Sequence, residues 1–492
     1  MKIPHLVQVL LFAAVSAHAD VTLNAVFAEH MDLQRDMPVA VYGLAAPGER
    51  VAVAFAGQKK SALTDKDGRW TLKLDAMRAA TTPAVMTVAG KNTLTIGDIV
   101  IGDVWVCSGQ SNMDFTPGAY GGPYDPAEFD VPLLRQFHCV NEPSMKPVTA
   151  VTANLVKPGD SGWLVCSKEF GNRFTAVGLY FGRKLQQETG VPIGLIKSAW
   201  NGTKIETWIS PDGVVAVPEL AAPKDLPAEP VISGSYPATW HCLYFGKIYP
   251  FTFFAIKGAI WYQGESNGDE EETYFQKQRA LIGGWRKAWN QGDFPFYFVQ
   301  LPAWQKPNDN PAGGDGWARF RMGQLKSLTI PHTGMAVAID LADVGKPDDI
   351  HPKDKKSVGE RLALWALAKD YGKKNLVYSG PLYKAMTIED GKIRISFDSV
   401  GSGLMIATRK GGFEPLVKEP QGKLRRFAIA GEDKVWVWAY AVIDGNTVLV
   451  SSPEAPKPVA VRYAYSMCPE GCNLYNNEGL PASPFRTDAW EK

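Results

Sequence analysis

The 492-residue sequence predicts an α/β protein in which a three-layer core of strands and helices lies between two β-sandwich-like domains. Three observations support this prediction. Short runs of alternating apolar and polar residues fill 20–97, strands and helices take turns over 98–375, and the alternation returns over 376–492. Strands that alternate with helices are typical of a parallel sheet covered on both faces. We therefore place the domain boundaries at these residues.

Residues 1–19 have the pattern of a secretory signal peptide. Lys2 precedes an apolar run from Leu6 to Val15, and Ala17-His18-Ala19 supplies a cleavage site of small residues. The run is too short to span a bilayer, and no later segment reaches about 18 uninterrupted apolar residues. We expect an exported protein, periplasmic or extracellular, without a membrane-spanning segment.

The two β-domains are predicted from short runs with turn residues between them. In the N-terminal domain, "VAVAFAG" is followed by "TDKDGRWTLKL", whose Asp67-Gly68 pair is typical of a hairpin turn. In the C-terminal domain, "TIEDGKIRISF" and "KVWVWAYAVIDGNTVLVSS" contain further Asp-Gly turns at 390–391 and 444–445.

The core is predicted from buried strands that alternate with amphipathic helices. The expected strands are 98–107, 191–200, 256–263, 294–301 and 334–341, and the expected helices are 175–190, 271–290, 316–328 and 352–372. Gly190 ends the first of these helices, and Pro352 and Gly372 bound the last. The Pro-rich stretch 212–237 is interpreted as a surface excursion of the core.

The charge balance excludes some partners. With 52 Lys and Arg against 51 Asp and Glu, the formal net charge is +1, which gives no electrostatic reason to expect a nucleic acid or an anionic membrane as partner. Fifteen Trp and 17 Tyr provide flat rings that suit the faces of sugars, although most are expected in the core. A small or uncharged partner is favoured, and the oligomeric state stays open.

The six cysteines would lie in a compartment that permits disulfides. Cys468 and Cys472, in "SMCPEGCN", are close enough to close a small loop, and we expect them to pair. A pair between Cys139 and Cys166 stays open, as does the state of Cys107 and Cys242. Zinc is the alternative for a C-x-x-x-C pair, but no second pair or His cluster accompanies it, so neither a metal nor another cofactor is expected.

The segment "WVCSGQSNM" places Ser111 directly after a buried strand. A serine there can be the nucleophile of a hydrolase, but it can equally cap a helix. Three more polar segments follow predicted strands, at 201–203, 263–267 and 348–351. Because reactive groups gather at the carboxyl ends of the strands in an open parallel sheet, the four segments should share one edge.

A serine nucleophile needs a base and a group that orients the base. Five histidines follow the expected cleavage site, and His351 stands out because it lies on the loop between a strand and a helix. Asp348, three residues upstream, fits the orienting role better than Asp349. The alternative is that Asp348, Asp349 and His351 only cap the following helix.

Acyl transfer also needs hydrogen-bond donors for the developing oxyanion. The backbone amides of Ser111 and Gly202 are candidates, and a side-chain amide from Gln263 or Asn267 could complete the set. Glycine after a strand and Asn near a helix are also common turn and cap residues.

The motifs "GQSNM", "WNGTKIETW", "WYQGESN" and "DDIHPKDKKSVGERLA", with the tail "CNLYNNEGLPASPFRTDAW", resemble the sialate O-acetylesterase family and related carbohydrate acetylesterases of the SGNH-hydrolase superfamily. The resemblance covers essentially all of the chain after the leader. It implies a flavodoxin-like α/β/α core, no metal, Ser111 as nucleophile, His351 as base and Asp348 as its orienting acid. It also implies an oxyanion hole made by Ser111, Gly202 and a side chain of the 263–267 segment.

Two residues depart from the general pattern of that superfamily. The general pattern has an Asn close after the Gly of the third segment, whereas this segment reads Gln-Gly-Glu-Ser-Asn over 263–267. Gln263 is favoured over Asn267 as the side-chain donor because it lies nearest the end of the strand. Asn201 stands where relatives often have a second glycine, which would narrow the pocket but leave the Gly202 amide free.

The resemblance implies an exported serine esterase that removes O-acetyl groups from a carbohydrate. The sugar stays open between acetylated sialic acid and acetylated hemicellulose fragments. A non-catalytic carbohydrate-binding protein, or a lipase or thioesterase of the same superfamily, are the alternatives. Intact Ser111, Asp348 and His351 argue against the first, and the lack of an apparent apolar lid segment argues against the second.

Overall fold

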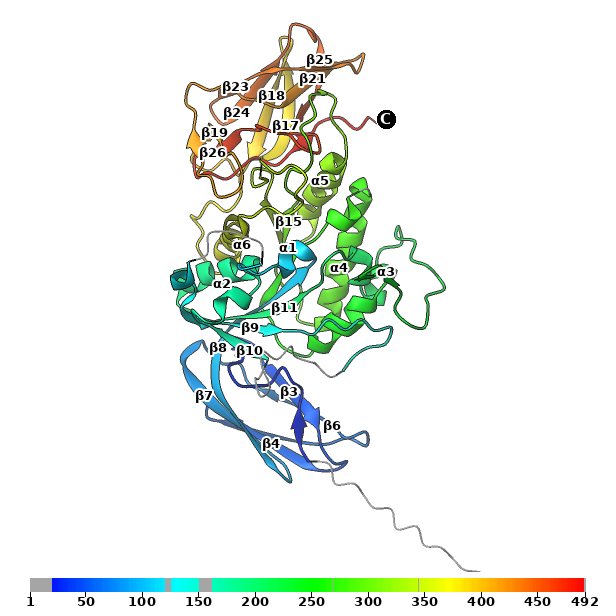
Figure 1. The fold of residues 1–492 in the computed structure, drawn as a ribbon, viewed down its shortest axis with the longest axis vertical. Coiled ribbons are helices and arrows are strands. Elements are labelled where there is room, and N and C mark those ends of the chain that lie inside the picture. The colour runs from blue at the N-terminus through cyan, green and yellow to red at the C-terminus, as the bar shows by residue number, and fades with distance from the viewer. Residues whose placement is uncertain (1–19, 120–124, 150–161, 269, 344, 491–492) are drawn as a thin grey trace, which may run out of the picture.

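The computed structural model describes residues 20–119, 125–149, 162–268, 270–343 and 345–490. The expected signal peptide, residues 1–19, lies outside them. Figure 1 shows an α/β body in the middle, with the N-terminal strands at one end of the long axis and the C-terminal strands at the other.

A mostly parallel sheet forms the middle of the α/β body. Its strands follow the order β10-β9-β11-β8-β14-β15-β16. All neighbouring pairs along this path are parallel except β10 with β9. Their bounds are β8 Thr93–Gly109, β9 Val131–His138, β10 Trp163–Cys166, β11 Ile193–Ala199, β14 Gly258–Tyr262, β15 Phe296–Gln300 and β16 Thr333–Val337. The predicted α/β class is confirmed.

Helices cover the sheet on both sides (Figure 1). α2 (Ala176–Thr189) and α6 (Lys355–Lys369) pack against each other on one side, while α4 (Tyr274–Trp289) lies on the other with α3 (Pro211–Val215) and α5 (Trp317–Lys326). The predicted end of α2 is confirmed, because Gly190 has φ +71° and donates its N–H to Gln186. α6 begins at Lys355 and not at the predicted Pro352. Its N-cap is Asp354, whose side chain accepts the N–H of Ser357.

Strand β8 joins the N-terminal strands to the α/β body. Its first half pairs with β7 and β2, and its second half pairs with β11 and β14. The expected boundary between 97 and 98 therefore falls inside a continuous strand. The N-terminal strands are β1 Thr22–Leu23, β2 Asp32–Gln34, β3 Val39–Leu44, β4 Arg50–Phe55, β5 Gln58–Leu63, β6 Arg69–Leu74 and β7 Ala80–Ala89. Their buried side chains belong to the same apolar cluster as those of the α/β body.

The C-terminal strands have a second apolar cluster of their own, which includes Ile393, Phe427 and Val461. The predicted turn at 390–391 is confirmed by positive φ values at Asp390 and Gly391. The strands are β17 Leu382–Glu389, β18 Lys392–Asp398, β19 Leu404–Thr408, β20 Val417–Lys418, β21 Phe427–Gly431, β22 Trp436–Trp438, β23 Tyr440–Asp444, β24 Thr447–Ser451, β25 Pro458–Tyr463, β26 Leu474–Asn476 and β27 Phe485–Arg486.

Two strands of the central sheet, β9 and β10, are absent from the sequence prediction. β9 carries Arg135 and Gln136 in its buried part, which break the apolar pattern expected of a buried strand. Both side chains have partners far away in the sequence. Arg135 pairs with Asp98 at 3.0 Å, and Gln136 Oε1 accepts the N–H of Thr175 at 2.9 Å.

The disulfide expected between Cys468 and Cys472 is not formed. All six cysteines carry free thiols, so the open pairings of the other four do not occur in this structure either. Burial raises the pKa of Cys472 to about 12 and also raises that of Cys468. A disulfide forms through a thiolate, which burial disfavours here.

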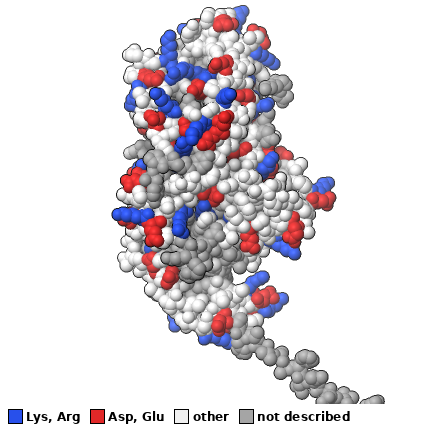
Figure 2. Space-filling model, in the orientation of Figure 1, with Lys and Arg blue, Asp and Glu red and all other residues white. Residues whose placement is uncertain are grey.

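The surface carries both signs of charge close together. Figure 2 shows Lys and Arg interspersed with Asp and Glu over the face in view, in keeping with the net charge of +1. None of the described helices is long and apolar enough to cross a membrane.

Arg321 of α5 ties the α/β body to the C-terminal segment. Its fully buried guanidinium donates to the carbonyls of Leu301 (2.9 Å), Pro302 (2.5 Å), Ser466 (2.8 Å) and Met467 (2.9 Å). Burial lowers its pKa to about 10, which still leaves it charged at neutral pH. These carbonyls would lose a charged donor if the side chain were removed.

We predict that Arg321→Met lowers the free energy of unfolding by at least about 3 kcal/mol, because several buried carbonyls then lack a charged donor. Denaturant unfolding followed by tryptophan fluorescence measures the loss. Arg279→Met is the matched control, since Arg279 is a partly exposed arginine that pairs with Glu219, and it should cost no more than about 1 kcal/mol. Equal losses in the two variants would contradict the bridging role of Arg321.

Candidate active site

The site lies where β8, β11 and β14 end side by side. Gln110 donates its N–H to Tyr262 O at 3.0 Å, and Trp200 donates to Gly109 O at 3.1 Å. Gly109 has φ +137°, and a Cβ at this position would lie 2.1 Å from the Tyr262 carbonyl oxygen. Only glycine therefore allows β8 to turn so close to the end of β14 and to present the next residues at the edge of the sheet.

Ser111 is the first residue of the short helix α1 (Ser111–Asp114), whose N-cap is Gln110. The alternative that Ser111 caps a helix is therefore wrong. Its Oγ lies 2.9 Å from Nε2 of His351, although the two residues are 240 positions apart. The structure brings together the serine and the histidine that the sequence predicts.

The carboxylate beside His351 belongs to Asp349 and not to Asp348, which corrects the expected orienting residue. Asp349 Oδ1 lies 3.5 Å from His351 Nδ1 and also accepts the His351 backbone N–H at 3.0 Å. Asp348 is exposed, and its backbone oxygen accepts the indole N–H of Trp304 at 3.3 Å. The turn closed by Asp349 brings its carboxylate to the Nδ1 side of the ring. Capping of α6 falls to Asp354, so the cap alternative for the 348–351 segment does not hold.

His351 has the ionisation that a general base requires. Burial and the nearby Lys355 ammonium lower the pKa of the imidazole from 6.5 to about 4, against the opposing effect of the Asp349 carboxylate. The Phe115 ring packs edge-on against the imidazole, with 4.9 Å between centroids. The imidazole is consequently neutral near pH 7 and can take a proton from the Ser111 hydroxyl.

The side chains of Gln263 and Asn267 do not supply the expected oxyanion donor. Gln263 uses both of its amide hydrogens, on Thr203 O at 3.1 Å and on Asn267 Oδ1 at 2.7 Å. Asn267 uses both of its own on the carboxylates of Glu206 and Glu270, at 2.9 and 2.8 Å. Both amides are thus spent in holding the end of β14, and neither keeps a hydrogen for a substrate.

The backbone amides of Ser111 and Gly202 remain candidates for the oxyanion hole. Within the described part of the chain, neither N–H has a hydrogen-bond acceptor. Gly202 has φ +67°, and a Cβ there would lie 2.7 Å from the ring of Tyr236, which belongs to β13 (Tyr236–Pro237). β13 pairs with β12 (Ile232–Ser233) in the Pro-rich excursion, so this segment of the chain packs against the predicted donor.

Three residues at the site had no role in the sequence analysis. Asn112 follows the serine, Glu265 follows β14, and Lys355 opens α6. Asn112 Oδ1 accepts from Lys355 Nζ at 2.7 Å, and Asn112 Nδ2 donates to Glu265 Oε1. A signal for Lys355 was present, because it shares one helical face with the buried residues Val358, Gly359 and Leu362.

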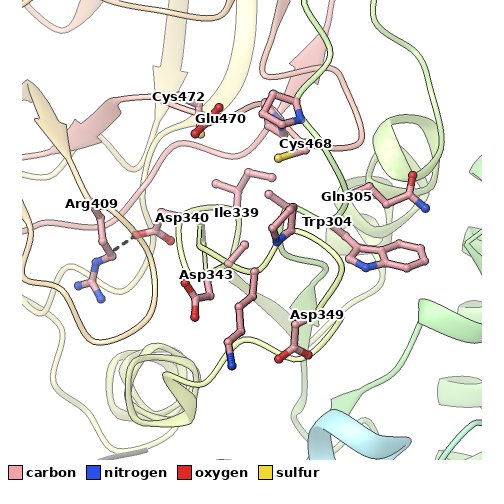
Figure 3. Close-up of a pocket in the computed structure, with 17 residues that line it drawn as sticks. Trp304, Gln305, Ile339, Asp340, Asp343, Asp349, Arg409, Cys468, Glu470 and Cys472 are labelled. Carbon is pink, nitrogen blue, oxygen red and sulfur yellow. Dashed lines mark ion pairs between the residues drawn. The ribbon is translucent and has the colours of Figure 1, made fainter.

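A cavity of about 160 Å³ lies beside Asp349, at the junction with the C-terminal segment. Asp349 and Trp304 form part of its wall, and Cys468 and Glu470 line it from the C-terminal side (Figure 3). Trp304 stacks on Trp317, with ring centroids 4.9 Å apart. Arg409 lies at the opposite side of the cavity, paired with Asp340.

No group of three or more His, Cys, Asp and Glu side chains is arranged to hold a metal ion in the described part of the chain. The expectation that neither a metal nor a cofactor takes part stays a prediction.

Comparison with known proteins gives consistent likenesses. Residues 101–368 match the family model described as "Carbohydrate esterase, sialic acid-specific acetylesterase". The sialate O-acetylesterase of Mus musculus is 30% identical, with 97% of both chains aligned, and that of Homo sapiens is 31% identical, with 92% of this chain and 90% of the human one aligned. A solved carbohydrate acetylesterase from Xanthomonas citri is 35% identical over 96% of this chain and 100% of its own, with a TM-score of 0.82.

We predict that Asp349→Asn lowers kcat for p-nitrophenyl acetate by orders of magnitude, because an amide beside Nδ1 favours the wrong imidazole tautomer. Asp348→Asn is the matched control and should stay within about threefold of the wild type, since its exposed side chain has no described contact with the ring. Steady-state kinetics of the two variants decide between them. A larger loss at Asp348 would return the orienting role to that residue.

We also predict the pH dependence of the same reaction. His351 must be neutral to act as base, and its pKa is lowered to about 4, so kcat/KM should rise with pH around pH 4 and stay level from about pH 5.5 to 7.5. Tryptophan fluorescence over the same range shows whether the protein stays folded. A midpoint near 6.5 would mean that the pKa of His351 is not shifted.

Proposed function

The chain belongs to the carbohydrate esterase family of sialic acid-specific acetylesterases and is a carbohydrate O-acetylesterase, and from this premise we propose that Ser111, His351 and Asp349 carry out the hydrolysis. The observation that supports the proposal is the 2.9 Å contact between Ser111 Oγ and His351 Nε2. The same contact argues against a non-catalytic carbohydrate-binding protein, because such a protein has no need to pair a serine hydroxyl with a neutral imidazole.

In the first half of the reaction, Ser111 Oγ attacks the carbonyl carbon of the acetyl ester while its proton passes to His351 Nε2. The carbonyl oxygen becomes an oxyanion, which the backbone amides of Ser111 and Gly202 stabilise. The tetrahedral intermediate then collapses and breaks the bond to the sugar oxygen. That oxygen takes the proton from His351, so the free sugar hydroxyl leaves and an acetyl group stays on Ser111.

In the second half, a water molecule takes the place of the sugar. It gives one proton to His351 Nε2 as its oxygen attacks the acetyl carbon, and the oxyanion forms again at the same donors. Collapse of this intermediate releases acetic acid, and His351 returns its proton to Ser111 Oγ. Asp349 keeps Nδ1 protonated throughout and stabilises the imidazolium of both steps.

We propose that the architecture is of the SGNH type, with a flavodoxin-like core flanked by β-sandwich-like domains. The strand order β11-β8-β14-β15-β16 supports this, since it corresponds to 2-1-3-4-5 in order of appearance along the chain. Ser111 follows β8, at the point where the strand order reverses, which is where ligands bind in such sheets.

We further propose that the protein is exported, on the basis of the leader at 1–19. The substrate is an acetylated carbohydrate, and the choice between an acetylated sialic acid and an acetylated hemicellulose fragment needs a direct measurement. Acetate release from 9-O-acetylated sialic acid and from acetylated xylo-oligosaccharides, at equal concentrations of acetyl groups, compares the two candidates.

The test of the proposed mechanism is Ser111→Ala, measured on p-nitrophenyl acetate and on the sugar substrate preferred by the wild type. We predict a loss of at least about 10³-fold in kcat, because only stabilisation by the oxyanion donors remains. The free energy of unfolding should not change by more than about 1 kcal/mol, since a single hydroxyl is removed. Activity within tenfold of the wild type would mean that another residue is the nucleophile.

A further inference from the structure

A buried polar network joins three of the segments that form the site. Asn112 lies next to the nucleophile, Glu265 follows β14, and Lys355 lies four residues after His351. Asn112 is at its centre, because its Oδ1 accepts from Lys355 Nζ at 2.7 Å while its Nδ2 donates to Glu265 Oε1 and, at 3.3 Å, to Ile350 O. An ammonium can only donate and a carbonyl can only accept, so these partners fix the orientation of the amide.

Burying the Lys355 ammonium at this position costs free energy. It is the first residue of α6, where the helix dipole disfavours a cation, and only 4% of its surface is exposed. Its Nζ also donates to the carbonyl of Pro352, on the loop that carries His351. A methionine or leucine would fill the same volume without having to bury a charge.

Charged and titratable groups from several segments act on Lys355. Glu265 faces it from the β14 side, Asp349 and His351 from the preceding loop, and Asp354 from the N-cap of its own helix. Burial lowers the pKa of Lys355 to about 7 and raises that of Glu265. On the acid limb of the pH profile, where kcat/KM rises around pH 4, Lys355 is therefore a cation. Its charge repels the imidazolium form of His351.

We propose that Lys355 is a positioning residue of the esterase, which holds the serine and histidine segments in register through Asn112 and whose charge keeps the imidazole of His351 free to accept a proton. The inference rests on the proposed roles of Ser111 and His351. Lys355 is given no proton-transfer role in this proposal, and its Nζ donates to Asn112 and to the Pro352 carbonyl. It acts on the substrate only through its neighbours.

The test compares pH profiles of kcat/KM for p-nitrophenyl acetate in Lys355→Met and Lys356→Met. Lys356 is the adjacent lysine, with a side chain that is 42% exposed and pairs with Glu128, so its variant removes the same charge without touching the network. The acid limb of Lys355→Met should move up by about one pH unit, toward the ordinary range of histidine. Its kcat at the plateau should fall at least tenfold with little change in KM, because the register of the pair is disturbed and binding is not. Lys356→Met should match the wild type.

Lys355→Met leaves the Glu265 carboxylate buried without its cation and could unfold the protein. The double variant Lys355→Met with Glu265→Gln removes both charges, should be more stable than the single variant, and should keep the raised acid limb. An acid limb at the wild-type pH in these variants overturns the proposal.

A measurement without substrate separates this inference from the proposed function. In the Ser111→Ala background, NMR of protein with ¹³C-labelled histidine titrates His351 directly, with and without Lys355→Met. A titration midpoint that rises on removal of Lys355 supports the inference whatever the reaction is, and an unchanged midpoint overturns it. Failure of the proposed function would appear elsewhere, as activity that survives Ser111→Ala.

Discussion

The 2.9 Å contact between Ser111 Oγ and His351 Nε2 is the interaction that the rest of the structure has to hold in place. The serine follows the end of β8, which is hydrogen-bonded to its neighbours through the backbone of Tyr262 and Trp200. The histidine lies on a loop just before α6, and α6 packs on α2 against the sheet. In the proposed mechanism, an error of about 1 Å between these two segments would cost much of the catalytic rate. The fold therefore sets the chemistry by fixing one distance between segments that are far apart in the sequence.

The sequence was sufficient to find the segments of the site, because each of them follows a strand and parallel strands end at one edge of the sheet. It was insufficient to decide which of two adjacent carboxylates faces His351. That choice depends on a local turn, in which Asp349 accepts the histidine N–H while Trp304 engages the backbone of Asp348. The role of Gln263 was likewise settled by partners that sequence reasoning cannot place, since Thr203 is 60 residues away. Strand β9 was missed for a related reason, because its buried polar side chains hide the pattern of a strand.

Buried charge recurs wherever the protein joins distant segments. Asp340, after β16, makes a two-pronged ion pair with Arg361 of α6, at 2.6 and 2.8 Å. Arg409, from the C-terminal segment, reaches both this aspartate and the N-cap residue Asp354. Burying such groups is expensive unless each finds a partner, so the contacts specify one arrangement more than they add stability. The C-terminal strands thereby brace the helix that follows His351, and they are more than an appendage to the esterase.

Two opposite charges act on His351, and the balance between them sets how readily its imidazole binds a proton. Asp349 stabilises the imidazolium, whereas burial and Lys355 destabilise it by more, so that the pKa falls to about 4. A weaker base provides less driving force for taking the serine proton, but a larger fraction of it is in the neutral form at acid pH. A base that stays neutral down to about pH 4 keeps its function over a wide range of pH. The charge that gives this tolerance has to lie close to the imidazole and yet be shielded from solvent ions, which is where α6 places Lys355.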